Sequence, residues 1–304
     1  MKKVSICIPA YKRADVLKRC LESVFEQDFT DFEVIVTDDS PNDDLKNLTE
    51  SYQDNRILYF KNNPALGSPE NWNEAIRKAS GEYIKIMHHD DWFATPQSLR
   101  KFVDMLDENP TADIAFSGSC DIYPSRKIVH ITSDRMLAQI MKEPEVLFKG
   151  NWIGDPSVCI FRNHRNFFFD SKLIWRVDTD FYISVLKQNP KIAYSKEILV
   201  HIGIDDFQVT KKCISSPDIL IKEAVYLYRK LNLNNKIYPY KKSLLRVIGG
   251  EIGDGMHLKG FNYKNGLLDG MELRAIDVFW AKYFFYKKQI RALLVKFISF
   301  LIRK

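Results

Sequence analysis

The residues IKIMHHDDW (84–92) join an apolar, β-prone run to two histidines and two aspartates. Imidazole and carboxylate groups bind protons and divalent cations, and hard cations such as Mn²⁺ and Mg²⁺ prefer oxygen ligands. A second acidic pair, Asp38 and Asp39, ends another β-prone run, FEVIVTDD (32–39). One Asp-Asp pair is more often a turn or a helix cap, but two pairs that each follow a strand favour a ligand-binding site.

These polar ends need a sheet to position them. Four β-prone runs, 4–10, 32–39, 57–62 and 82–91, alternate with helical patterns that include 43–53 and 68–80. The alternation predicts an α/β fold with a parallel sheet and helices on both faces. Ser68 is expected to cap the third helix, with Pro69 at its first position. Because ligands of such sheets bind beyond the carboxyl ends of the strands, residues 9–11, 38–40 and 88–91 should meet in one crevice.

Four aspartates in one crevice repel one another unless a cation or a donor-rich ligand offsets their charge. A divalent cation held by one or two carboxylates usually bridges to the phosphates of a substrate. Neither G-x-x-x-x-G-K-[ST] nor G-x-G-x-x-G follows the first strand, so a glycine-rich phosphate loop is not expected. The phosphates of a nucleotide would therefore be bound by a metal or by scattered basic groups.

Three segments together resemble the inverting glycosyltransferases of family 2: VSICIPAYKR, FEVIVTDDSPND and NNPALGSPENWNEAIRKASGEYIKIMHHDDW. The resemblance covers about the first 120 residues well and extends more loosely to about 210. It implies a GT-A fold, which is a Rossmann-like, mostly parallel sheet flanked by helices. It also implies transfer of a sugar from a nucleotide diphosphate, with UDP as the expected nucleotide, and Mn²⁺ or Mg²⁺ as the cofactor.

The same resemblance implies which residues bind the donor. Those expected around the nucleotide are Pro9, Ala10, Tyr11, Arg13, Asp38, Asp39, Gly67, Asn73, His88, His89 and Asp90. Asp90 is the expected metal ligand, and Asp91 and His201 are further candidates, with Asp205 or Asp206 as alternatives to His201. The chain departs from the family pattern at His88, which stands where the first aspartate of a D-x-D motif is common.

Inversion needs a base that takes a proton from the acceptor hydroxyl. The segment VDTDFYISVL begins a predicted helix with Asp178 and Asp180 in its first turn. Residue types alone favour a simpler role, in which both acids complement the positive end of the helix. The resemblance makes Asp178 the expected base, with Asp180 as the alternative. In NWIGDPSVCIFR (151–162), Trp152 and Asp155 could meet donor or acceptor, although a structural turn explains them equally well.

The two parts of the chain differ in charge. Residues 1–210 contain 26 basic and 32 acidic side chains, whereas residues 211–304 contain 19 basic and 7 acidic ones. Apolar residues at helical spacing, with basic residues between them, run through 278–304 and fit an amphipathic helix on an anionic membrane. Packing on the catalytic domain or on a second subunit of a homodimer is the equal alternative. No nucleic-acid-binding motif accompanies the basic charge, so nucleic acid is not an expected partner.

These observations predict three parts. Residues 1–125 form a nucleotide-sugar-binding α/β subdomain, 126–210 the acceptor-binding and catalytic-base part of the same domain, and 211–304 a basic helical region. The five cysteines lack a C-x-x-C pattern and the N-terminal apolar run is shorter than a signal peptide needs, so we expect a cytoplasmic location, including the inner face of the plasma membrane. The predicted acceptor is a glycan or lipid-linked glycan of the cell surface. The rival hypotheses are a sugar-phosphate nucleotidyltransferase and a non-catalytic nucleotide-sugar-binding or scaffold subunit.

Overall fold

A computed structural model describes residues 2–164, 167–205, 213, 216–233, 239–252, 279–280, 282–287, 290–291 and 293. The chain divides into two compact units, Met1–Gln208 and Val209–Lys304. The candidate ligand Asp206 and most of 278–304 lie outside the described residues. The predicted boundary at residue 125 falls inside the first unit and stays a prediction.

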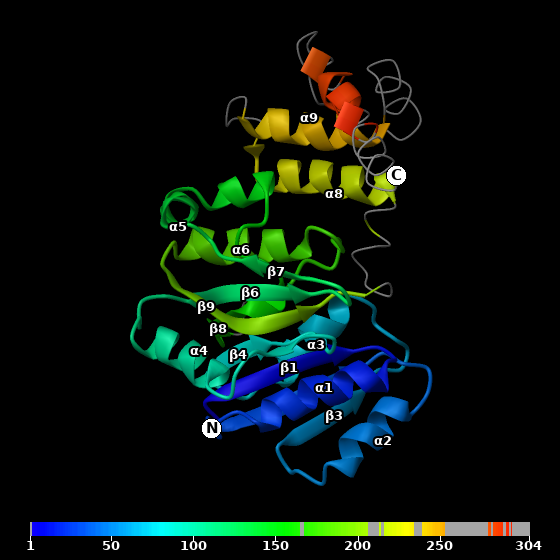
Figure 1. The fold of residues 1–304 in the computed structure, drawn as a ribbon, viewed down its shortest axis with the longest axis vertical. Helices are drawn as coiled ribbons and strands as arrows, with labels where there is room; N and C mark the ends of the chain where they lie inside the picture. Colours follow the sequence, from blue (N-terminus) through cyan, green and yellow to red (C-terminus); the bar gives the residue numbers. More distant parts are fainter. Residues whose placement is uncertain are drawn as a thin grey trace. The chain divides into compact units, whose positions relative to one another are not determined.

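The first unit is built on one nine-stranded sheet (Figure 1). Its strands along the sheet are in the order β3-β2-β1-β4-β8-β6-β9-β5, with β7 paired to β6. Their bounds are β1 Val4–Ala10, β2 Phe32–Asp38, β3 Ile57–Lys61, β4 Tyr83–Ile86, β5 Trp92–Phe93, β6 Ile114–Ile122, β7 Lys127–His130, β8 Cys159–Arg162 and β9 Ile192–Gly203. Strands β3, β2, β1 and β4 run parallel to one another, whereas β8 pairs antiparallel with both β4 and β6.

The helices of this unit bury different shares of their surface, and several of them bury a single apolar face. They are α1 Ala14–Phe25, α2 Asp44–Ser51, α3 Glu70–Lys78, α4 Ser98–Asp107, α5 Asp134–Lys142 and α6 Val177–Gln188, with short 3₁₀ helices η1 Pro144–Lys149 and η2 Pro156–Val158. In α1, for example, Val16, Leu17, Cys20, Leu21 and Val24 are buried, which is the spacing of one helix face. Strands β1 and β2 are buried along their whole length, as expected for parallel strands covered on both faces.

The position of β1 brings the polar strand ends together. It lies between β2 and β4 and runs parallel to both, with Ala10 opposite Asp38 and Cys7 opposite Ile86. The Asp39 amide then donates to the Ala10 carbonyl (3.1 Å), and the Met87 amide donates to the Cys7 carbonyl (2.9 Å). The ends of β1, β2 and β4 therefore lie at one edge of the sheet, as the strand–helix alternation predicts.

The predicted cap of the third helix is wrong. Helix α3 begins at Glu70, one residue later than expected, and the buried Ser68 hydroxyl has no hydrogen-bond partner among the described residues. The first amides of the helix instead donate to backbone carbonyls, from Asn71 to Gly67 (2.8 Å) and from Asn73 to Pro69 (3.1 Å). A turn of backbone therefore does what the serine side chain was expected to do.

The described part of the second unit is helical. Helices α8 Pro217–Lys230 and α9 Pro239–Ile252 contact each other and bury Ile221, Val225, Tyr228, Leu244 and Ile248. Shorter helical stretches lie between 279 and 293. In the part of the chain that the structure describes, every helix is too short or too polar to cross a membrane.

Candidate functional site

Asp38 is buried at the end of β2, and protein donors surround its carboxylate. Its Oδ1 accepts a hydrogen bond from the Ser40 amide (2.7 Å), and its Oδ2 accepts from the Tyr59 hydroxyl (2.6 Å) and the Lys61 ammonium (3.1 Å). Burial would raise the pKa of Asp38, but hydrogen bonds from Ser40, Tyr59 and Lys61 outweigh burial and hold the pKa below its ordinary value. Asp38 is therefore a stabilised carboxylate.

Asp39 is also buried, and it holds the loop that precedes α3. Its Oδ1 accepts from the Asn62 side chain (2.8 Å) and the Leu66 amide (2.9 Å), and its Oδ2 accepts from the Gly67 amide (2.7 Å). Gly67 has a φ of 74°, in the left-handed region that favours glycine. We refer to Asp38 and Asp39 as the outer acidic pair, because Asp38 ends β2 and Asp39 follows it, toward the β3 side of the sheet.

The remaining residues predicted at the nucleotide differ in exposure. Pro9 and Ala10 are buried at the end of β1, whereas Tyr11 is 49% exposed beside them. Asn73, expected near the base and ribose, is buried, and its amide exchanges hydrogen bonds with the backbone of Phe169 (2.9 and 2.8 Å). Its contacts are those of a structural residue, and its role at the nucleotide stays a prediction.

Arg13 forms an ionic link across the crevice edge. It pairs with Asp15 (3.0 Å) and with Asp205 (2.8 Å), a residue that follows β9. Its positive charge also contributes to the lowered pKa of His89, although burial is the larger cause. Arg13 thus ties the end of β1 to the end of β9 next to the histidine pair.

The turn after β4 holds the two histidines and the second pair of aspartates. The His88 ring lies beside the Trp72 ring (4.5 Å between centroids), and its Nε2 is buried without a hydrogen-bond partner among the described residues. Burial lowers the pKa of His88 to about 4, against the opposing effect of Asp90, so this imidazole is neutral at pH 7. The Asp90 carboxylate accepts no hydrogen bond from the described part of the chain.

A buried lysine connects this turn to the segment before β8. Lys85, in β4, is fully buried, and its ammonium donates to the Ile86 carbonyl (3.0 Å) and to the Ser157 carbonyl. The Ser157 hydroxyl in turn accepts from the His88 amide (2.9 Å) and contacts the Asp91 carboxylate. Burial lowers the pKa of Lys85 to about 7. Lys85 and Ser157 therefore fix the 88–91 turn against the 155–158 segment.

Asp178 lies in the first turn of α6, where the sequence places the base. Its Oδ1 accepts from the Thr179 amide and its Oδ2 from the Asn151 side chain, both at 2.7 Å. Burial and then the negative charge of Asp155 raise its pKa to about 7. A base with a pKa near the working pH is well matched to proton abstraction. Asp180, the alternative base, is only 2% exposed.

The second pair of aspartates and Asp178 belong to one electrostatic group. Burial, followed by the charges of Asp90 and Asp155, raises the pKa of Asp91 well above its ordinary value. Asp155 reaches solvent but lies in a hollow, and desolvation followed by the charges of Asp121 and Asp90 raises its pKa to about 6. We refer to Asp90, Asp91, Asp155 and Asp178 as the central acidic group, because the charges of Asp90 and Asp155 help to raise the pKa of Asp91, and the charge of Asp155 helps to raise the pKa of Asp178.

The central acidic group fits a divalent cation in its chemistry. Its mutually repelling carboxylates would be relieved by positive charge, and the Asp90 oxygens and the buried His88 Nε2 have no hydrogen-bond partner among the described residues. The described residues nevertheless contain no group of three or more His, Cys, Asp or Glu placed to hold a metal. His201 packs its ring against Trp92 (5.4 Å between centroids), and its role as a ligand stays a prediction. A cation at Asp90 would need most of its remaining ligands from a substrate or from water.

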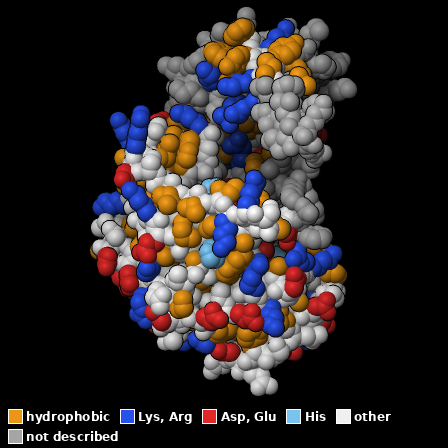
Figure 2. Space-filling view, in the orientation of Figure 1, with side chains coloured by type: hydrophobic (Ala, Val, Ile, Leu, Met, Phe, Trp, Pro, Cys, Tyr) orange, Lys and Arg blue, Asp and Glu red, His pale blue; other side chains and the backbone are white. Residues whose placement is uncertain are grey.

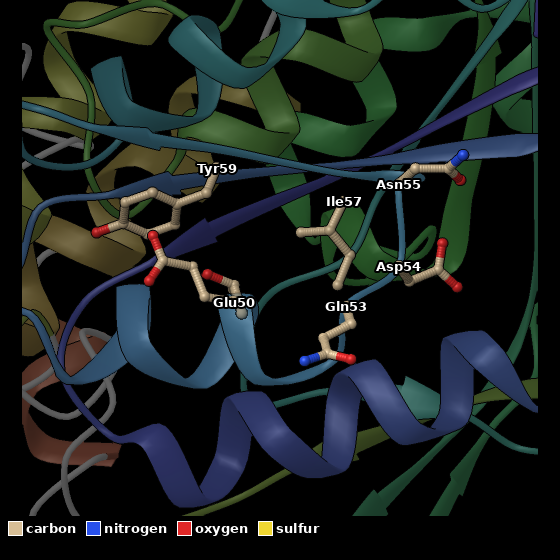
Figure 3. Close-up of a pocket in the computed structure, with 7 residues that line it drawn as sticks. Glu50, Gln53, Asp54, Asn55, Ile57 and Tyr59 are labelled. Atoms are coloured by element: carbon tan, nitrogen blue, oxygen red, sulfur yellow. The ribbon is translucent and has the colours of Figure 1, made fainter.

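A depression of about 310 Å³ between α2 and β3 is separate from this chemistry (Figure 3). Its lining includes Glu50, Asp54 and Tyr59, and the Tyr59 hydroxyl already binds Asp38. Asp54 is paired with Arg56 (2.7 Å). We assign no function to this depression.

Three residues of the site were not predicted from the sequence. Lys85 carried a usable signal, because a lysine inside the otherwise apolar run YIKIM must be either at an edge or paired in the interior. Asn151 and Ser157 carried none, because polar residues in a Gly-Pro segment are ordinary turn residues. Their contacts with Asp178 and His88 join segments that are distant in the sequence.

Comparison with known proteins relates this arrangement to sugar transfer. The family model described as "Glycosyl transferase family 2" matches residues 5–178. The chain is 25% identical over 265 residues to the UDP-Glc:alpha-D-GlcNAc-diphosphoundecaprenol beta-1,3-glucosyltransferase WfgD of Escherichia coli, covering 86% of this chain and 97% of that protein.

Solved structures share the fold. The crystal structure of S. aureus TarS 1–349 with UDP-GlcNAc matches with a TM-score of 0.59 at 18% identity, covering 92% of this chain and 79% of that chain. Against a longer TarS chain, the match spans 46% of that chain. The mannosyltransferase PcManGT of Pyrobaculum calidifontis, in complex with GDP-Man and Mn²⁺, matches with a TM-score of 0.57 at 15% identity, covering 96% and 87% of the two chains. From its family match and its GT-A fold, the chain belongs to glycosyltransferase family 2.

Proposed function

We propose that this glycosyltransferase is inverting and metal-dependent, and that it transfers a hexosyl or N-acetylhexosaminyl group from UDP to a hydroxyl of a lipid-linked glycan. The observation that carries the proposal is Asp178, a carboxylate with a pKa of about 7 in the same electrostatic group as Asp90. The names of WfgD and TarS support a UDP-sugar donor, and the name of WfgD supports a diphospholipid-linked acceptor. Synthesis of a cell-surface polysaccharide is the process that such an acceptor would serve.

In the proposed reaction, Asp178 takes the proton of the acceptor hydroxyl as that oxygen attacks the anomeric carbon. The new C–O bond forms on the face opposite the bond to the diphosphate, which breaks with its electron pair and inverts the anomeric centre. The Asn151 side chain and the Thr179 amide each donate to one oxygen of Asp178, which fixes the carboxylate and leaves each oxygen a further lone pair that can take the proton. A divalent cation, when bound at Asp90 with Asp91 and His201 as further candidates, supplies positive charge that offsets the departing diphosphate.

The nucleotide would bind at the ends of β1 and β2. Tyr11 is the exposed aromatic side chain there, and Asp39 shapes the pocket by holding the loop that contains Gly67. Arg13 and the histidine pair border the same crevice. In this arrangement Asp38 and Asp39 act mainly through the backbone that they position, and Asp39 can still accept a hydrogen bond from the base.

Calorimetry with UDP and Mn²⁺ tests the metal assignment. We expect Asp90→Ala to weaken binding of UDP–Mn²⁺ by at least ~10-fold, because a carboxylate ligand is lost, while UDP alone binds as in the parent. Asp104→Ala, on the α4 surface, serves as the control. Equal affinity of Asp90→Ala and the parent for UDP–Mn²⁺ would remove Asp90 from the metal site.

Metal-stimulated release of UDP from one of a panel of nucleotide sugars would exclude a non-catalytic subunit.

Contact with the inner face of a membrane through 278–304 is a further part of the proposal. Among the described residues of this segment, Phe279, Tyr283, Tyr286, Ile290 and Leu293 are large apolar side chains with 43–66% exposure. Lys282, Lys287 and Arg291 lie between them, and Figure 2 shows hydrophobic and basic side chains close together there. Flotation with anionic vesicles tests membrane contact, and the concentration dependence of molecular mass tests the alternative of a homodimer.

A further inference from the structure

A cavity of about 540 Å³ opens beside the central acidic group. It is lined by residues of β6, of β7 and the start of α5, and of the 151–155 segment. The side chains that matter for its chemistry are Ser119, Asp121, His130, Asn151, Trp152 and Asp155. Its lining takes no residue from β1, β2 or β3, nor from the 62–73 segment, so it lies apart from the proposed nucleotide pocket.

A carboxylate–imidazole pair stands in this cavity. Asp121 Oδ2 and His130 Nε2 are 2.9 Å apart across the β6–β7 pairing, with side-chain exposures of 17% and 55%. The second Asp121 oxygen can accept from a ligand hydroxyl, and the Ser119 hydroxyl can both donate and accept. The cavity thus offers several directed hydrogen-bonding groups at one wall.

The same cavity has an apolar side. Val129 and Ile131 also line it and are 56% and 52% exposed, and Trp152 is a further lining residue. A pyranose ring presents hydroxyls at its edge and C–H groups on its faces, which matches a pocket of hydrogen-bonding groups bordered by an indole and aliphatic side chains.

Charge decides which part of a substrate this cavity can hold. Its lining contains the carboxylates of Asp121 and Asp155 and, among the described residues, no lysine or arginine. A phosphate or diphosphate would be repelled there, because two like charges would be brought together without a cation. A neutral, hydroxyl-rich ring would meet no such repulsion.

The cavity also reaches the proposed base. Asn151 lines it and donates to the Asp178 carboxylate at 2.7 Å, and Asp155 lines it while contributing to the raised pKa of Asp178. A ring held by Asp121 and His130 can therefore present another of its hydroxyls toward Asp178.

We propose that this cavity binds a neutral sugar ring of the acceptor, with the Asp121–His130 pair as the group that recognises its hydroxyls. That the bound sugar belongs to the acceptor rests on the proposed function, whereas the binding of a sugar ring in this cavity does not. Asp121 and His130 act by positioning the acceptor, and they take no part in proton transfer at the reacting hydroxyl.

Saturation-transfer NMR with methyl glycosides of glucose, galactose, mannose and N-acetylglucosamine tests sugar binding directly. It is carried out on the full chain, with and without UDP and Mn²⁺, and needs no catalytic turnover. We expect saturable binding of at least one glycoside, weakened by at least ~10-fold in Asp121→Asn and in Trp152→Ala, because each change removes a main contact of the ring. His130→Gln should weaken it less, because an amide can replace the imidazole N–H.

The chain offers a matched control pair at the other end of β6. Asp113 Oδ1 and His164 Nε2 are 3.1 Å apart, with side-chain exposures of 19% and 48%. Asp113→Asn and His164→Gln remove the same kinds of group outside the cavity, so glycoside binding should equal that of the parent. The melting temperature of each variant shows whether the fold is retained.

The outcomes separate this inference from the proposed function. Saturable binding that Asp121→Asn abolishes and Asp113→Asn leaves intact supports the cavity, even if no nucleotide sugar is turned over. If turnover is found, the acceptor KM should rise ~10-fold in Asp121→Asn while the Kd for UDP changes less than ~2-fold. No saturable binding of any glycoside, or equal losses in the cavity and control variants, would overturn the inference while UDP–Mn²⁺ binding still stood.

Discussion

The outer acidic pair and the central acidic group contain the same residue type at the same edge of the sheet, but their surroundings differ. Asp38 and Asp39 accept six hydrogen bonds at 2.6–3.1 Å from protein donors. In the central group, Asp91, Asp155 and Asp178 have raised pKa values, because they are desolvated and lie near other carboxylates. The pKa of Asp38, in contrast, lies below its ordinary value.

This difference separates structural from reactive carboxylates. A carboxylate whose lone pairs are taken by fixed donors is stable as an anion and is a poor base. A carboxylate held near other carboxylates is stabilised when it binds a proton or a cation, which is what a base and a metal site require. Under the proposed function, the outer pair builds the nucleotide end of the crevice and the central group supplies the base and the metal ligand.

The largest expected effect is the loss of transfer in Asp178→Asn. The amide keeps the shape of the side chain but cannot take a proton, so kcat should fall by at least ~10²-fold, while UDP–Mn²⁺ binds nearly as tightly as to the parent. Initial rates and calorimetry on the same preparation measure the two quantities. Asp180→Asn is the matched comparison in the same helix turn. If Asp178→Asn kept its activity and Asp180→Asn lost it, the role of base would pass to Asp180.

The pH dependence of the parent sharpens the same prediction. Because the pKa of Asp178 is about 7, its carboxylate must lose a proton before it can act as a base, so kcat should rise with pH and level off above about 7. The low-pH limb should be absent from the residual activity of Asp178→Asn. A parent profile that is flat between pH 5 and 8 would contradict the raised pKa.

The stability of two matched variants tests the comparison directly. Asp38→Asn should lower the free energy of unfolding by about 2 kcal/mol at pH 7, since at least one of its buried or partly buried donors loses its acceptor. Asp91→Asn should cost less than about 1 kcal/mol, because it removes a charge that the folded state disfavours. Urea unfolding of both variants measures the difference. Equal losses would mean that the two acidic pairs are not energetically distinct.

The last expected effect is a change in the slope of stability with pH, and it concerns the buried Lys85. Since its folded-state pKa is about 7 and its ordinary value is 10.5, the unfolded chain binds the extra proton between these values, and the stability contributed by Lys85 rises with pH in that window. Lys85→Met should therefore flatten the rise in stability between pH 7.5 and 9.5 by up to about 1.4 kcal/mol per pH unit. Identical slopes in parent and variant would show that Lys85 stays charged in the folded protein.

Much of the first unit could be predicted from the sequence. The runs 4–10, 32–39 and 57–62 became β1, β2 and β3, and the VDTDFYISVL segment became α6 with Asp178 in its first turn. The antiparallel insertion of β8 between β4 and β6 was not predicted, because pairing between distant strands leaves no local pattern. The predicted cap of α3 was wrong for a similar reason, because the first amides of the helix donate to backbone carbonyls and not to the Ser68 hydroxyl.

The sequence by itself determined the order of strands and helices and the residues that follow each strand, because periodicity and turn chemistry are properties of neighbouring residues. Only the tertiary structure decided that Asp38 is stabilised by Tyr59 and Lys61 while Asp178 is held by Asn151 and opposed by Asp155. The acidity of a carboxylate depends on burial and on charges contributed by distant segments, and these exist only once the chain has folded.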